Sequence, residues 1–171
     1  GGTLGPTGYR FKMRDGLVLS EGVPAQVYTI ELRFTLDNIA DYQKLIDFKE
    51  LTADEGFYVH KDVVDFVVNA NPPPIEAPGV GTVIAGQVLA ITLSRGATGV
   101  VAAYLNGAPT LMYDDAAAGA AVFSHQAQVA HFFSDDTKTA AEDAVGYARQ
   151  ITIWDRALTA SQIAALPAAT P

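Results

Sequence analysis

The sequence predicts an all-β fold, a sandwich of two antiparallel sheets with one short helix at the C-terminus. Three observations support this prediction. Apolar and polar residues alternate along short segments, tight-turn signals separate these segments, and only the C-terminal end carries a helix signature. Many short strands at such spacing are typical of antiparallel two-sheet sandwiches.

The clearest strand runs from Tyr28 to Leu36. Its even-numbered positions are all apolar, and its odd-numbered positions hold Thr29, Glu31, Arg33 and Thr35. Successive side chains of a strand point to opposite faces of a sheet. We therefore expect a half-buried strand, with the even-numbered residues in the core and the odd-numbered face in solvent.

Eight further segments carry weaker strand signals. They comprise residues 44–48, 57–60, 63–68, 88–95, 100–106, 122–123, 128–134 and 145–154. Asn106-Gly107 indicates a hairpin turn because both residues tolerate positive φ. The proline-rich segment 69–81 is expected to be a surface loop, since proline cannot donate to a sheet ladder. The alanine-rich segment 116–121 is expected to be a loop or a short helical turn.

The C-terminal helix signature begins at Thr159. Thr159 and Gln162 have the spacing of a capping box, and Leu158 and Ile163 have that of a hydrophobic staple. Pro167 is expected to end the helix. The domain therefore spans residues 1–167, and residues 168–171 form a tail or the start of a linker.

Size and composition exclude several classes of function. The chain has 171 residues, which suits one domain, and no cysteine, which excludes disulfides and thiolate metal sites. Its net charge of −8, from 19 acidic and 11 basic residues, argues against a nucleic-acid partner. No apolar run is long enough to cross a membrane.

Four acidic residues stand close to two predicted strand ends. Asp135 and Asp136 follow one strand, and Glu142 and Asp143 precede the next. Calcium prefers oxygen ligands of this kind, so the four residues are predicted to form a calcium site. In one alternative Arg149 pairs with Glu142 in place of the ion, and in another the loop is simply solvated. The acidic segment 47–55 is a weaker candidate site.

The sequence shows no catalytic pattern. Glu31 is followed by Leu32 and Arg33, so the Glu-x-Asp-x-Glu spacing of strand-borne glycan hydrolases is not present. No Gly-x-Ser-x-Gly elbow and no zinc-binding histidine spacing occur. His131 with Tyr147 and Arg149 could serve a lyase, but packing and solubility explain these residues more simply. We therefore expect a protein that is not an enzyme.

Exposed aromatic rings would indicate a sugar site, because such rings stack on the apolar faces of pyranoses. The candidates are Tyr42, Tyr58, Tyr104, Tyr113 and Trp154. Most aromatic residues on alternating strands belong to the core, and these form no clear array. The sequence therefore assigns no ligand-binding residues.

Five phrases, in order, carry a family resemblance: IELRFTLD, YQKLIDFKELTADEGFYV, ITLSRGATGVVAAYLNG, HFFSDD and ITIWDRALTASQIAAL. Together they resemble successive strands of a laminin-G-like jelly roll of the concanavalin-A-like lectin and glucanase superfamily, in its bacterial secreted and surface form. The resemblance covers nearly the whole chain.

This resemblance implies a non-catalytic binding or adhesion module of a bacterial extracellular or cell-surface protein. Its implied ligand is a carbohydrate, bound with the help of calcium. A structural spacer or protein-interaction domain is the first alternative, with another extracellular protein as its partner. A polysaccharide-active enzyme is the second. Because one fold hosts many functions, the implied ligand rests on analogy.

Overall fold

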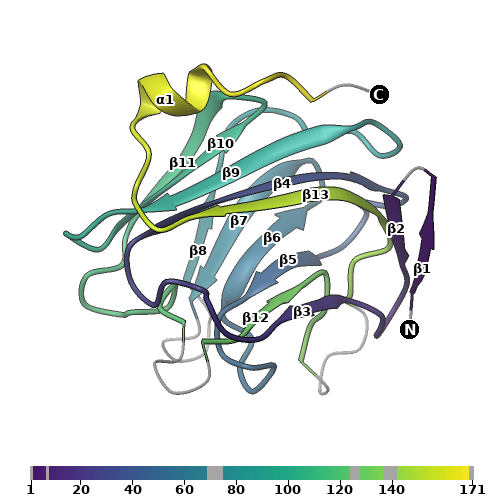
Figure 1. Ribbon diagram of the computed structural model, residues 1–171, viewed down its shortest axis with the longest axis horizontal. Helices are drawn as coiled ribbons and strands as arrows, with labels where there is room; N and C mark the ends of the chain where they lie inside the picture. Colours follow the sequence, from purple (N-terminus) through teal and green to yellow (C-terminus); the bar gives the residue numbers. More distant parts are fainter. Residues whose placement is uncertain (1, 7, 69–74, 124–127, 137–141, 170–171) are drawn as a thin grey trace.

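The computed structural model describes residues 2–6, 8–68, 75–123, 128–136 and 142–169 (Figure 1). It confirms the predicted all-β sandwich, with two sheets whose neighbouring strands all pair antiparallel. The seven-stranded sheet has the order β1 (Thr3–Gly5), β2 (Gly8–Phe11), β13 (Gly146–Trp154), β4 (Tyr28–Leu36), β9 (Leu89–Arg95), β10 (Val100–Leu105) and β11 (Ala108–Asp114). The six-stranded sheet has the order β3 (Leu17–Leu19), β12 (Ala130–Phe132), β5 (Gln43–Asp47), β6 (Gly56–His60), β7 (Val63–Val68) and β8 (Ile75–Pro78).

The core lies between the two sheets. Phe34 of β4 and Phe66 of β7 are fully buried in the same cluster, so each sheet contributes its inner face. The ring of Phe133, just after β12, stacks on that of Phe11 at a centroid distance of 4.1 Å. It also packs against the ring of Phe34 at 5.6 Å. Aromatic contacts therefore join β12 of one sheet to β2 and β4 of the other.

Strand β4 confirms the predicted alternation on its inner face, where all five even-numbered residues are fully buried. The outer face departs from the prediction, because Thr29 and Glu31 are buried as well. The hydroxyl of Thr29 accepts a hydrogen bond from the backbone N–H of Leu158 at 2.8 Å. Arg33 donates to the carbonyl oxygen of Pro167 at 2.6 Å. The C-terminal segment thus covers a face that the sequence predicted to be solvated.

Several local features differ from the sequence prediction, and β1 and β3 were not among the predicted strands. Residues 122–123 form no strand, although Phe123 is fully buried against Tyr28 and Phe48. Strand β11, which completes the hairpin at Asn106-Gly107, was not predicted. Residues 75–78 form the edge strand β8 rather than a loop, which is where a sheet tolerates proline. Residues 69–74 of the predicted loop lie outside the described part of the chain.

The C-terminal helix α1 (Ala160–Ala164) has the predicted N-terminus. The side chain of Thr159 accepts from the backbone N–H of Gln162, and Gln162 accepts from the backbone N–H of Thr159, as in a capping box. Leu158 and Ile163 pack together with Tyr104 of β10. Tertiary packing therefore stabilises a helix too short to form alone. Among the described residues, no helix is long and apolar enough to span a membrane.

Candidate functional site

Two chain segments converge on strand β5. The backbone N–H of Phe133 donates to the carbonyl of Leu45 at 3.1 Å, and that of Lys44 donates to the carbonyl of Glu142 at 2.8 Å. The pairing of β5 with β6 shifts register between Lys44 and Ile46. A bulge of this kind re-aims side chains at the edge of a ladder. Phe133 and Glu142, which lie on either side of the predicted acidic loop, are therefore both hydrogen-bonded to β5.

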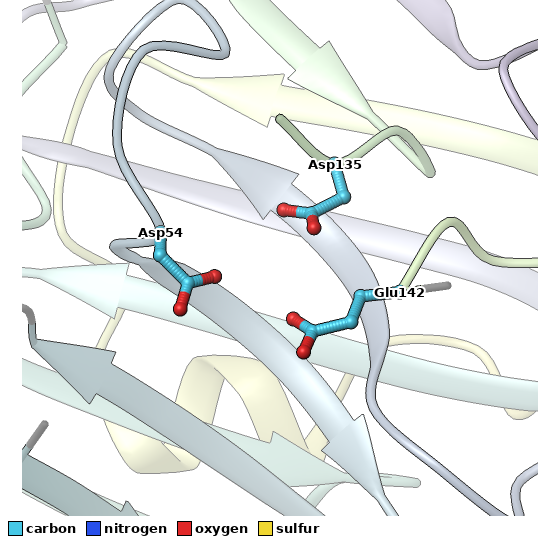
Figure 2. Close-up of side chains that lie close together, drawn as sticks. All are labelled: Asp54, Asp135 and Glu142. Carbon is cyan, nitrogen blue, oxygen red and sulfur yellow. The ribbon is translucent and has the colours of Figure 1, made fainter. Parts of the chain in front are cut away.

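A third segment, the connection from β5 to β6, brings Asp54 to the same place. Figure 2 shows Asp54, Asp135 and Glu142 pointing toward one another, and one oxygen from each lies within 4.8 Å of the others. Calcium–oxygen distances are about 2.3–2.6 Å, so a small inward movement of these side chains lets one ion contact all three oxygens. The structure thus joins Asp135 and Glu142 of the predicted site to Asp54 of the weaker candidate segment.

The other two predicted ligands take different positions. One oxygen of Asp143 accepts from the backbone N–H of Asp135 at 2.8 Å, and the other accepts from that of Arg14 at 3.1 Å. Asp143 therefore holds the loop in place. Asp136 is buried, and together with Asp135 and Asp143 it lines a cavity of about 290 Å³. Asp135 is common to this cavity and to the three converging carboxylates.

A fully buried lysine contacts the acidic group. Nζ of Lys44 lies 2.9 Å from Oδ1 of Asp135 and 3.2 Å from Oδ2 of Asp47. A Cβ atom on Gly56 would lie 2.5 Å from Cε of Lys44, so glycine leaves room for this chain. Arg149, the predicted substitute for the ion, is exposed and makes no ion pair with Glu142 in the described structure. Lys44 is the cation beside the cluster.

The group still carries more negative than positive charge, because Asp47, Asp54, Asp135 and Glu142 surround one ammonium. Burial, reinforced by the charges of Asp54 and Asp135, raises the pKa of Glu142 to about 7, and Lys44 opposes this rise. Burial also raises the pKa of Asp135, against the opposing effects of Lys44 and the backbone N–H of Asp136. A further cation at this position would lower both pKa values.

The residues present could hold a metal ion. The side chain of Asp135 is fully buried, and its Oδ2 makes no well-formed hydrogen bond with any described residue. Lys44 contacts the other oxygen of that carboxylate, so Oδ2 remains for an ion together with Asp54 and Glu142. All these donors are hard oxygens, which suit calcium or magnesium better than zinc.

One of the predicted aromatic candidates is a half-exposed ring beside the cluster. Tyr42 stacks on His60 at a centroid distance of 3.7 Å and meets the edge of Tyr58 at 5.7 Å. The buried hydroxyl of Tyr58 donates to Oδ1 of Asp54 at 2.9 Å. Burial raises the pKa of Tyr58, which keeps its phenol neutral. Trp154 instead packs with Tyr104 beneath the C-terminal segment.

Sequence reasoning missed Lys44 and the contact between the two acidic segments. The available signal was a charged residue in a predicted strand, directly before the apolar pair Leu45-Ile46. Lysine is almost never fully buried unless it is paired. Such a position therefore predicts a buried carboxylate partner, although it does not say which one.

No protein-family model matches the chain, and no curated protein matches its sequence. Solved structures do share its fold. Domain 4 of AbnA, a GH43 extracellular arabinanase of Geobacillus stearothermophilus in complex with arabinotriose, is 15% identical, with a TM-score of 0.61 over 95% of this chain and 78% of that one. The CBM40 of the Ruminococcus gnavus IT-sialidase, bound to α2,3 sialyllactose, is 13% identical, with a TM-score of 0.63 over 88% of this chain and 95% of that one.

A third similar structure is the heptameric SAP-like pentraxin of Limulus polyphemus, which is 20% identical, with a TM-score of 0.60 over 95% of this chain and 77% of that one. These identities are low enough that the likeness concerns the fold alone. The chain shares the β-sandwich of lectin-like and carbohydrate-binding domains.

Proposed function

We propose that this domain is a non-catalytic carbohydrate-binding module, assisted by calcium and belonging to an extracellular or cell-surface protein of a bacterium. Asp54, Asp135 and Glu142 hold the ion. The saccharide enters the adjacent cavity, where its hydroxyl groups meet the acidic residues that line it, Asp135, Asp136 and Asp143. The laminin-G-like subtype and a role in adhesion belong to the same proposal.

The observation that carries this proposal is the position of Asp135. Its carboxylate lies beside Asp54 and Glu142, and the same residue is among those that line the cavity of about 290 Å³. A cavity of this volume lies just below the range of about 300–1,000 Å³ for drug-sized ligands, so it suits a small one. One residue therefore connects the ion to the ligand, and binding of each is expected to favour the other.

The similar structures add support from outside the chain. The arabinanase domain is in complex with arabinotriose, and the CBM40 is bound to sialyllactose. Another similar structure is a putative carbohydrate binding protein of Bacteroides ovatus, 14% identical, with a TM-score of 0.64 over 87% of this chain and 43% of that one. The half-exposed ring of Tyr42 supplies an aromatic surface near the cluster.

A glycan array probed with and without calcium tests the proposal. We expect retention of one class of saccharide in calcium and its loss in EDTA. Asp54→Asn and Glu142→Gln remove proposed ligands and should abolish calcium-dependent retention. Asp155→Asn, which changes an exposed carboxylate at the end of β13, is the matched control and should bind like the wild type. Equal retention by all four proteins in EDTA would contradict the role of calcium.

Glycoside hydrolysis is a second candidate, favoured by the electrostatics of the cluster. Retaining glycosidases hold two carboxyl groups about 5–5.5 Å apart, one of them with a raised pKa. Glu142 has a pKa of about 7 and lies within reach of Asp54. However, the cavity beside the cluster is lined by Asp135, Asp136 and Asp143, and neither Glu142 nor Asp54 reaches it. If the wild type releases reducing ends from a polysaccharide and Glu142→Gln does not, the protein is a glycoside hydrolase.

Protein interaction is a third candidate, favoured by the edge strand β3. Val18 is 58% exposed and Leu19 is 37% exposed on this strand, next to the unpaired edge of the six-stranded sheet. Exposed edges of this kind can pair with an added strand. Val18→Lys should abolish binding to a protein partner and leave retention of a saccharide unchanged.

A further inference from the structure

A second cavity, of about 240 Å³, lies on the outer face of the seven-stranded sheet. Its floor is formed by Glu31 of β4 and by Ala90 and Thr92 of β9. Its roof is formed by α1 and by residues 166–169, which cross above these strands (Figure 1). The acidic cluster is attached to the other sheet, so the two sites share no residue.

The floor of this cavity is polar and buried. Glu31 and Thr92 pair directly across β4 and β9, and their exposed fractions are 4% and 2%. Nε of Arg33 donates to Oε1 of Glu31 at 2.6 Å, but a carboxylate can accept several more hydrogen bonds. The hydroxyl of Thr92 makes no hydrogen bond within the described chain. The carboxylate of Glu31 can therefore accept further hydrogen bonds from a ligand, and the hydroxyl of Thr92 can donate or accept one.

The roof is held in place from two directions. Arg33 donates to the carbonyl oxygens of Pro167 at 2.6 Å and of Ala168 at 3.3 Å. The capping box fixes the start of α1, and Ile163 is buried against Leu158 and Tyr104. These contacts anchor both ends of the roof, so the cavity exists before a ligand binds. Binding therefore requires no costly rearrangement of the roof.

We propose that this cavity binds one neutral, polyhydroxylated molecule the size of a single monosaccharide. The volume lies below the range of about 300–1,000 Å³ that holds drug-sized ligands, which excludes an oligosaccharide. Vicinal hydroxyl groups donate to Glu31 and exchange hydrogen bonds with Thr92, and the ring carbons contact Ile163 and Leu166. Because Arg33 already neutralises Glu31, a neutral ligand fits better than a charged one.

Titration of the ¹⁵N-labelled protein with D-galactose, L-arabinose and glycerol tests this proposal. We expect saturable shifts of the amide signals of Thr92, Gly107 and Ala164 with at least one of these probes. EDTA is present throughout, which separates this site from the proposed calcium-assisted one, since that site should not bind under these conditions.

Three variants locate the binding. Thr92→Val keeps the shape but removes the hydroxyl, and should weaken binding about five- to tenfold, the worth of one hydrogen bond. Ala164→Trp should fill the cavity and abolish the shifts. Ala165→Trp changes an exposed neighbour that does not line the cavity, and should bind like the wild type. If the wild type shows no shifts, or if its affinity survives Thr92→Val unchanged, the proposal is wrong.

Discussion

The amino group of Lys44 lies 2.9 Å from Oδ1 of Asp135, and both side chains are fully buried. This ion pair joins β5 to the loop that follows β12, at the point where the candidate metal ligands meet. Removing two charges from water is costly, and their attraction offsets the cost only when further hydrogen bonds complete the network. Here Ala53, Asp47 and Tyr58 supply such contacts.

The first prediction concerns loss of this lysine. Lys44→Met keeps the length of the side chain but leaves the buried carboxylates of Asp47 and Asp135 without their cation. We expect the free energy of unfolding in EDTA to fall by about 3–5 kcal/mol. Urea denaturation measures this loss, and calcium should restore part of it by neutralising Asp135, which belongs to both groups.

Lys12→Met is the control for this experiment, because Lys12 is exposed. Its effect on stability should stay within about 0.5 kcal/mol. If Lys44→Met is as mild as Lys12→Met, the buried ion pair does not contribute to stability as the geometry indicates.

The second prediction concerns pH. Glu142 has a pKa of about 7 in the folded protein and an ordinary value of 4.5. Between these values the folded state binds a proton that the unfolded state has released, so the contribution of Glu142 to stability falls as pH rises from about 4.5 to 7. Asp135, whose pKa is also raised, acts in the same direction.

Glu142→Gln removes this titration without a large change of shape. In EDTA, the variant should match the wild type near pH 4.5 and become the more stable protein above pH 7. Urea denaturation across this range provides the measurement, with Asp155→Asn expected to follow the wild type. Parallel curves for the wild type and Glu142→Gln would show that Glu142 titrates normally.

Much of the fold could be predicted because alternation is a local property. In β4 every second residue is apolar, and every one of these residues is fully buried. What covers the other face is not local. The carbonyls of Pro167 and Ala168, which bind Arg33, are more than a hundred positions away in the sequence. Strand β8 was not predicted for a similar reason. An edge strand tolerates proline, and only the assembled sheet shows that residues 75–78 lie at an edge.

The site could be predicted only in part. Asp135 and Glu142 belong to one loop and were recognised from their spacing, whereas Asp54 belongs to another loop and meets them only through the pairing around β5. Asp143 is an acidic residue next to Glu142 and before the same predicted strand, yet its carboxylate accepts hydrogen bonds from backbone N–H groups. Carboxylates that bind an ion and carboxylates that cap a loop look alike in a sequence.

The third prediction tests the alternation in β4. Phe34 is fully buried and Thr35 is partly exposed. Phe34→Ala should therefore lower the free energy of unfolding by about 3–5 kcal/mol, through lost burial and the cavity that remains. Thr35→Ala should lower it by less than about 1 kcal/mol. Equal losses in urea denaturation would contradict the register of β4.

The last prediction concerns calcium and stability. If Asp54, Asp135 and Glu142 hold the ion, calcium binds the folded state alone and stabilises it by about 2.7 kcal/mol at a hundredfold excess over Kd. For a domain of this size the melting temperature should rise by roughly 5–10 °C. Magnesium should substitute poorly because it demands a smaller, octahedral site. EDTA should reverse the rise.

Asp54→Asn and Glu142→Gln are the informative variants for this shift. Each removes one ligand but leaves the pair between Lys44 and Asp135 intact, so the protein without calcium should stay folded and lose only its response to the ion. Asp135→Asn is less informative, because it also removes one of the two carboxylates that pair with Lys44 and destabilises the fold by itself. If chelation and then excess calcium leave the wild-type melting curve unchanged, these carboxylates do not bind calcium, and the pair with Lys44 accounts for the cluster among the described residues.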